Sequence, residues 1–308
     1  MKELLRATTA YRTIAGYASA KELPHATLVV FPDGKYLRAL LRECAKAYFP
    51  AEERISRLVG EERYPDCIYL PAEGGKLTTD DCARMVDESL LRPMEADKKL
   101  FVLDAFHTAT PLIQNKLLKL LEEPPQGVYF LIGATAEFSL LPTILSRVRK
   151  LAEPPFSEEA VASALRRMRG EERGIARAAA ASGGVVSLAE MLLDGEDAFR
   201  LAECFLKEDG IEELCRSLDK SAEKKTFFAA VRLYLRDALL HAEGFSRFAA
   251  LGEGEVRGID IPAGALVKAM ELIAEAERNT EFNANFGQAA YALALQIREE
   301  KLKWQKLS

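Results

Sequence analysis

Residues 100–132 read LFVLDAFHTATPLIQNKLLKLLEEPPQGVYFLI, and this stretch decides the fold of the N-terminal half. It begins with one apolar run, Leu100 to Leu103, and ends with another, Val128 to Ile132. Both runs are apolar throughout instead of alternating, which is typical of strands that are covered on both faces. Between them, apolar residues from Ile113 to Leu121 form one helical face. The stretch therefore predicts a strand–helix–strand unit of a parallel sheet.

The helix inside this stretch has signals at both ends. Thr110 suits the N-cap, and Pro111 suits the first helical position. Pro124 and Pro125 then end the helix, because the residue before a proline avoids the helical region. We therefore expect a helix within Thr110 to Glu123.

The same alternation extends on both sides of this stretch and stops at Glu153-Pro-Pro155. Earlier in the chain, two more apolar runs predict strands, Thr27–Phe31 and Cys67–Leu70, and two patterns predict helices, Tyr36–Tyr48 and Asp80–Leu90. After the break the pattern is helical, with Gly183-Gly184 as a turn, Gly252–Gly258 as a loop, and late helices over Ala263–Arg278 and Phe286–Lys303. The fold class is therefore an α/β parallel-sheet domain followed by helical domains, divided as 1–154, 155–195 and 196–308.

Composition excludes several classes of protein. The chain has 308 residues, of which 49% are apolar and 29% charged, and its net charge is -5. A protein that holds DNA alone by neutralising phosphates is usually basic, so any DNA contact is local or shared with partners. Five cysteines without a C-x-x-C pair predict neither a disulfide framework nor a zinc site. No apolar run is long enough for a membrane span and no signal peptide is evident, so we expect a cytoplasmic protein.

The place for a phosphate-binding loop is directly after the first strand. Such a loop needs glycines whose backbone N–H groups surround the phosphates, a lysine, and a Ser or Thr that holds magnesium. The segment at this place, residues 31–36, has only one glycine. Asp33 adds negative charge to it, and Tyr36 replaces the magnesium-binding hydroxyl. Without its context the segment is simply a turn. It reads Phe31-Pro32-Asp33-Gly34-Lys35-Tyr36.

Three further residues could belong to nucleotide chemistry. Asp104 ends the third predicted strand, where a magnesium-holding carboxylate is expected, or it simply caps a turn. Ala105 stands where hydrolysing proteins have a glutamate that activates water. Arg147 follows the fourth strand, and an arginine there can reach a neighbour's γ-phosphate or be an ordinary surface residue. The three histidines show no metal-ligand spacing.

These segments carry a family resemblance. Asn115–Pro125, Phe130–Ile132 and Leu141–Arg147 are similar to the clamp-loader pattern N-A-L-L-K-x-L-E-E-P-P … F-I-L … L-P-x-T-I-x-S-R-C. Three shorter stretches resemble the P-H-A, H-P-D and N-x-N elements of the same family: Pro24–Ala26, Tyr64–Asp66 and Phe282–Asn285. The chain thus resembles the delta-prime subunits of the bacterial DNA polymerase III clamp loader, which are of the AAA+ type.

The resemblance implies three domains: an AAA+-like α/β domain with a degenerate phosphate loop, a helical lid, and an all-α collar for oligomerisation. Clamp loaders open a ring-shaped sliding clamp and close it around primed DNA. The implied partners are the motor (gamma/tau) and delta subunits, and, through the assembly, the sliding clamp and primer-template DNA. Arg147 with Ser146 would serve as an arginine finger in trans for a neighbouring motor subunit.

Departures from the family pattern refine this expectation. Val148 replaces the usual cysteine after the finger arginine, and Val186 replaces the arginine of the lid. Only Cys44 lies where related chains carry a four-cysteine zinc module. The phosphate loop is altered, and both the catalytic glutamate and the lid arginine are replaced. We therefore expect no cofactor, no metal and no intrinsic ATPase activity. The alternatives are a motor-type ATPase that binds nucleotide through Lys35 and Asp104, or an AAA+-derived interaction protein outside replication.

Overall fold

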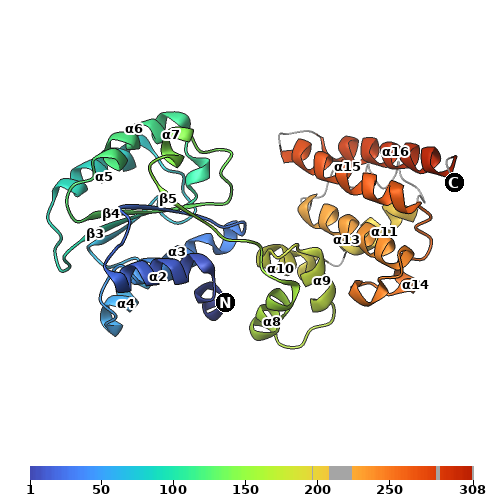
Figure 1. Cartoon of the computed structure of the whole chain (residues 1–308), viewed down its shortest axis with the longest axis horizontal. Helices are drawn as coiled ribbons and strands as arrows, with labels where there is room; N and C mark the ends of the chain where they lie inside the picture. Colours follow the sequence, from blue (N-terminus) through green and yellow to red (C-terminus); the bar gives the residue numbers. More distant parts are fainter. Residues whose placement is uncertain (196, 208–223, 282–284, 307–308) are drawn as a thin grey trace. The chain divides into compact units, whose positions relative to one another are not determined.

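The structure is a computed structural model that describes residues 1–195, 197–207, 224–281 and 285–306. The chain forms two compact units, Met1–Pro155 and Phe156–Ser308 (Figure 1). The predicted three-domain division at 154 and 195 stays a prediction. None of the helices in the described ranges is long and apolar enough to cross a membrane.

Unit 1 is an α/β layer structure. Its elements are α1 (Lys2–Arg6), α2 (Thr9–Ala20), β1 (Ala26–Val30), α3 (Gly34–Lys46), α4 (Glu53–Gly60), β2 (Cys67–Leu70), α5 (Thr79–Leu90), β3 (Lys99–Leu103), the 3₁₀ turn η1 (Phe106–Thr108), α6 (Pro111–Glu122), β4 (Val128–Ala134), α7 (Pro142–Leu145) and β5 (Arg149–Ala152). The predicted helix over Thr110–Glu123 is confirmed, and the Thr110 side chain accepts the N–H of Ile113 as its N-cap.

The strands form one parallel sheet in the order β2-β3-β4-β1-β5. The four strands predicted from apolar runs are confirmed, with ends shifted by at most two residues. The fifth strand was not predicted. It is an edge strand that begins Arg149-Lys150, and its side chains are mostly exposed, so it lacks the apolar run that marked the other four.

Helices cover both faces of the sheet: α2, α3 and α4 lie on one face, and α5, α6 and α7 on the other (Figure 1). Helix α3 packs closely on β4, since a Cβ added at Gly133 would lie 2.6 Å from Cδ1 of Leu41. On the opposite face, the rings of Phe101 and Phe130 stack with centroids 5.5 Å apart beneath Leu117 and its neighbours of α6. Close packing on both faces explains why these strands are apolar throughout.

Unit 2 is helical in its described part. Its elements are α8 (Glu158–Arg169), α9 (Ile175–Ala181), α10 (Val186–Asp194), α11 (Asp197–Lys207), α13 (Lys224–Ala242), the 3₁₀ turn η2 (Ser246–Phe248), α14 (Glu253–Val256), α15 (Ala263–Glu281) and α16 (Phe286–Gln305). Its core includes Phe227, whose ring makes edge-on contacts with those of Phe205, Phe228 and Phe286.

The late helices predicted over Ala263–Arg278 and Phe286–Lys303 are confirmed as α15 and α16, which end three and two residues later. The turn at Gly183-Gly184 is confirmed, and both residues have positive φ, 58° and 86°. The loop predicted over 252–258 is wrong in part, because α14 lies within it; the Glu255 carboxylate accepts the N–H of Gly252 and stabilises the start of this short helix. Residues 282–284 of the predicted N-x-N element lie outside the described residues. Asn285 caps α16, accepting the N–H of Gln288 at 2.8 Å.

Candidate functional site

The segment predicted as a degenerate phosphate loop is shorter than expected. Strand β1 ends at Val30 and α3 begins at Gly34, so only residues 31–33 connect them. Gly34, Lys35 and Tyr36 form the first turn of α3, which corrects the prediction that the loop extends to Tyr36. Phe31 is buried, and its N–H donates to the carbonyl of Ala134 at 2.9 Å. The connection therefore stays close to the sheet instead of forming an open ring around a ligand.

Asp33 is the reason for this early helix start. It is the N-cap of α3, its carboxylate accepts the N–H of Tyr36 at 3.4 Å, and the residue is only 1% exposed. The first turn of a helix is where an anion binds, because its N–H groups lack helical partners and the dipole is positive there. In this chain the negative group at that point is the protein's own carboxylate. Lys35 lies at the surface, with its ammonium 5.4 Å from the centre of the Tyr36 ring.

Asp104 lies at the end of β3, as predicted, but its carboxylate is engaged within the chain. Oδ2 accepts from Nη1 of Arg38 at 3.2 Å, and Oδ1 accepts the N–H of Ala105 at 2.7 Å. A carboxylate that holds magnesium must offer its oxygens to the ion. Here a guanidinium from α3 already occupies one of them. Sequence reasoning missed Arg38, which looks like any other charged residue of an amphipathic helix.

Arg38 is the centre of a buried ionic network. The residue is 6% exposed, and its guanidinium binds Glu62 through two hydrogen bonds, of 2.7 and 2.5 Å, and the carbonyl of Pro71 at 3.1 Å. Arg42 also binds Glu62, at 2.7 Å. Burial by itself would raise the pKa of Glu62, but the hydrogen bonds from Arg38 and Arg42 outweigh it and hold this pKa below its usual value. The network joins α3 to the ends of β2 and β3.

The segment after Asp104 has a structural role. Ala105 adopts a left-handed conformation with φ 47°, and η1 follows directly. Nδ1 of His107 accepts the N–H of Thr135 at 3.2 Å, which ties η1 to the end of β4. Burial lowers the pKa of His107, although the nearby charge of Asp104 acts to raise it. At neutral pH this imidazole is therefore an uncharged acceptor. The methyl group of Ala105 offers no base for water activation.

Arg147 lies just after α7, where the predicted S-R motif ends the short helix. Its Nη1 donates to the carbonyl of Thr143 at 2.8 Å and to Oγ of Ser146 at 3.0 Å. Its Nη2 forms an ion pair with Glu122, the last residue of α6. The Arg147 side chain is 32% exposed and that of Glu122 44%. An open hollow of about 620 Å³ surrounds the pair, lined by Pro24, His25, Ala26, Leu121, Glu122, Ser146, Arg147, Val148 and Arg149.

The predicted site residues lie at two ends of the sheet. Asp33 and Asp104 follow the carboxyl ends of β1 and β3. Arg147 precedes β5, and Arg149 at the start of β5 pairs with Thr27 at the start of β1. Strand β1 has five residues, so the two ends are separated by about 16 Å of strand. The structure therefore brings Asp33, Arg38 and Asp104 to the carboxyl end of the parallel strands and places Arg147 at the amino end.

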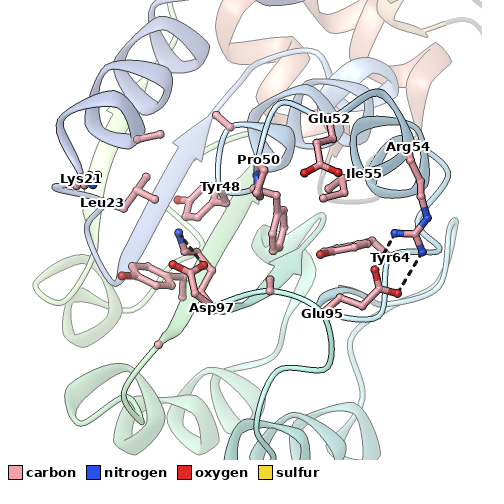
Figure 2. Close-up of a pocket in the computed structure, with 17 residues that line it drawn as sticks. Lys21, Leu23, Tyr48, Pro50, Glu52, Arg54, Ile55, Tyr64, Glu95 and Asp97 are labelled. Carbon is pink, nitrogen blue, oxygen red and sulfur yellow. Dashed lines mark hydrogen bonds and ion pairs between the residues drawn. The ribbon is translucent and has the colours of Figure 1, made fainter.

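The segment predicted as the H-P-D element has a structural explanation. Asp66 is fully buried, and its carboxylate accepts three backbone N–H groups, those of Met94, Glu95 and Ala96, at 2.6 to 2.7 Å. A carboxylate with three such donors fixes the course of the chain before β3. Next to it lies a hollow of about 830 Å³ with aromatic walls and a rim that contains the Arg54–Glu95 ion pair (Figure 2).

Metal ligands do not gather anywhere in the described ranges: no group of three or more His, Cys, Asp or Glu residues is placed so that it could hold an ion. His241, one of the three histidines, has polar partners within the chain: its ring nitrogens contact Oγ of Ser246 and the carbonyl of Leu251. The four cysteines within the described ranges are free thiols, and burial raises the pKa of Cys44 and Cys67 far above the usual range.

The parallel sheet in the order β2-β3-β4-β1-β5, with helices on both faces, makes unit 1 an α/β domain. Residues 7–156, nearly all of unit 1, match the family described as DNA polymerase III, delta subunit. Unit 1 is thus similar to a family of DNA polymerase III subunits, over slightly less than half of the whole chain.

Curated relatives are also subunits of DNA polymerase III. The chain is 26% identical over 249 residues to the DNA polymerase III subunit tau of Escherichia coli, a match that covers 79% of this chain and 37% of that protein. It is 35% identical over 68 residues to the subunit gamma/tau of Mycobacterium tuberculosis, which covers 22% of this chain and 12% of the relative. The chain therefore spans well under half the length of these relatives.

Solved structures of similar proteins include a DNA polymerase III gamma subunit-related protein of Thermotoga maritima, with 18% identity, a TM-score of 0.44, and coverage of 94% of this chain and 99% of that one. The clamp loader delta protein of Bacillus subtilis matches with 10% identity and a TM-score of 0.37, over 93% and 99% of the two chains.

Proposed function

We propose that this chain is a delta-prime-like subunit of the DNA polymerase III clamp loader that does not hydrolyse ATP and completes a neighbouring subunit's ATP site with Arg147. One observation carries the proposal. The end of the sheet where this chain would hold its own nucleotide is occupied by Asp33 and by the Arg38–Asp104 pair, whereas Arg147 lies partly exposed at the other end.

The chemistry of Arg147 suits phosphoryl transfer in trans. A guanidinium keeps its charge at physiological pH and can donate two parallel hydrogen bonds to phosphate oxygens. In other phosphoryl-transfer enzymes an arginine supplied by a neighbour offsets the charge that develops on the γ-phosphate in the transition state. Arg147 is about a strand's length from this chain's own phosphate end, so it can reach only a nucleotide held by another subunit.

The partners in this proposal are the motor (gamma/tau) and delta subunits, and, through the assembly, the sliding clamp and primer-template DNA. Residues 155–195 would act as the lid, and residues 196–308 would join the collar. The site of action is the cytoplasm, where bacterial replication takes place.

The test is ATPase activity of the clamp loader reconstituted with Arg147→Ala. We expect assembly to be intact, and the activity of the ATP site next to Arg147 to fall by about 10³-fold, as in other arginine-finger systems. Arg92→Ala is the matched control, because it removes another exposed arginine of unit 1. Unchanged ATPase activity and clamp loading with Arg147→Ala would contradict the proposal.

A second candidate is a motor-type ATPase. The observation in its favour is that the curated relatives carry the names tau and gamma/tau. In that case nucleotide would have to bind beside Lys35 and Asp104. Titration calorimetry of the isolated chain with Mg-ATP separates the candidates, because micromolar binding with turnover contradicts a subunit without ATPase activity.

A third candidate is an AAA+-derived interaction protein outside replication. A pull-down of the tagged chain from its own cells distinguishes it from the first two. Recovery of gamma/tau and delta subunits supports a clamp-loader role, and recovery of other proteins in their place contradicts it.

A further inference from the structure

The guanidinium of Arg147 has two kinds of acceptor. Nη1 donates to two neutral oxygens of its own segment, the carbonyl of Thr143 and Oγ of Ser146, at 2.8 and 3.0 Å. Nη2 instead pairs with the carboxylate of Glu122, which comes from a different helix. The neutral acceptors hold Nη1 of the guanidinium, and the carboxylate is paired with Nη2.

Glu122 has an unfavourable position in its own helix. It is the last residue of α6, where the helix dipole is negative and a carboxylate is disfavoured. The charge of Arg147 offsets this. The two side chains are 32% and 44% exposed, and ion pairs with such exposure contribute only about 1.5- to 5-fold to an equilibrium constant. The pair is therefore strong enough to hold Arg147 in a free chain and weak enough to exchange for a more highly charged partner.

We propose that Glu122 is a positioning residue that competes with a neighbour's ATP for Arg147, and so sets how tightly that ATP is held. This inference rests on the proposed function of Arg147. A γ-phosphate that approaches Arg147 needs the Nη2 edge of the guanidinium, which Glu122 occupies. The bonds to Thr143 and Ser146 persist during the exchange and keep the arginine in place. The displaced carboxylate then lies near the phosphates and repels them, which lowers the affinity of the site.

The test is an ATP titration of ATPase activity in the reconstituted clamp loader carrying Glu122→Gln. We expect KM for ATP to fall by about 1.5- to fivefold, the range of a partly exposed ion pair, with kcat unchanged. The effect should shrink at high salt, because salt screens the pair that the wild type must break. Glu123→Gln is the matched control, since it removes the same charge from an exposed residue one position along.

A double variant, Glu122→Gln with Arg147→Ala, ties the effect to Arg147. We expect its KM to equal that of Arg147→Ala alone; if Glu122→Gln still lowers KM in that background, the proposal is wrong. It is also wrong if Glu122→Gln raises KM, lowers kcat, or changes KM no more than Glu123→Gln does. A failure of the proposed function gives a different result, because Arg147→Ala would then leave the ATPase activity unchanged. Equal thermal unfolding of the variants shows that all are folded.

Discussion

The two ends of the sheet in unit 1 differ in how their charges are used. At the carboxyl end, Asp33 is 1% exposed and Arg38 6%, and each is bound within the chain. At the amino end, Arg147 is 32% exposed and is held by a single carboxylate and two neutral oxygens. Charges at the first end are buried and bound within the chain, whereas the charge at the second is partly exposed, and we propose that it exchanges partners. Substitutions should therefore act on folding at one end and on activity at the other.

The largest expected effect is that of Arg38→Ala. Removing the guanidinium leaves Glu62 and Asp104 without their main partner in a poorly solvated place, and breaking a buried pair in this way costs about 3–5 kcal/mol. Because both carboxylates retain some contact with water, we expect about 3 kcal/mol, measured by urea unfolding of the isolated chain.

Arg42→Ala is the control for this prediction. Arg42 also binds Glu62, but its side chain is 28% exposed, so we expect a loss of about 1 kcal/mol or less. If both variants unfold at the same urea concentration, the network does not depend on Arg38 in the way described.

The next effect concerns the start of α3. Asp33→Ala removes the N-cap, and such a loss costs about 1 kcal/mol, with a range of about 0.5–2. Asp33→Asn keeps an oxygen acceptor and should restore most of the stability in the same urea experiment. Equal losses in the two variants would mean that the charge of Asp33, and not its capping bond, stabilises the helix.

A smaller effect is a dependence of stability on pH. The pKa of Glu62 in the folded chain is held below its unfolded value of about 4.3. Its contribution is therefore fully present above that value and is lost as the pH falls through the folded pKa. Unfolding measured from pH 6 downwards should show a steeper loss of stability in the wild type than in Glu62→Gln. If the stability of the two proteins falls equally steeply with pH, the lowered pKa of Glu62 is contradicted.

The smallest effect on folding is expected at the amino end. Arg147→Ala removes a partly exposed ion pair, so the free energy of unfolding should change by no more than about 1 kcal/mol. Thermal unfolding beside the ATPase assay provides the comparison. If Arg147→Ala lowers the free energy of unfolding as much as Arg38→Ala does, the two ends of the sheet do not differ in their effect on folding.

Sequence patterns predicted the parts of the fold that have local signals. Apolar runs marked four strands, and Thr110 with Pro111 marked the start of α6, all of which the structure confirms. Strand β5 lacked such a signal because Arg149 and Lys150 are exposed at the sheet edge. The extent of the phosphate segment was also wrong, since the capping bond of Asp33 brings Gly34 to Tyr36 into the helix.

Sequence reasoning predicted a residue of the candidate site only where its own position in the chain indicated a role. Asp104 and Arg147 lie at the ends of elements and were found by position. Their partners were missed, because Arg38 is 66 residues from Asp104 in sequence and Glu122 is 25 residues from Arg147. Pairs at such separations are brought together only by the folded sheet, and no local spacing indicates them. The roles of these residues stay predictions until the experiments above are done.

The capped start of α3 also has a consequence for how this chain can evolve. We infer that nucleotide binding at this end of the sheet would require both the loss of the Asp33 cap and the release of Asp104 from Arg38. Each change alone lowers stability, and the loss of Arg38 would consume a large share of the roughly 5–15 kcal/mol that keeps a domain folded. A return to nucleotide binding at these positions is therefore expected to be accompanied by stabilising substitutions elsewhere in unit 1.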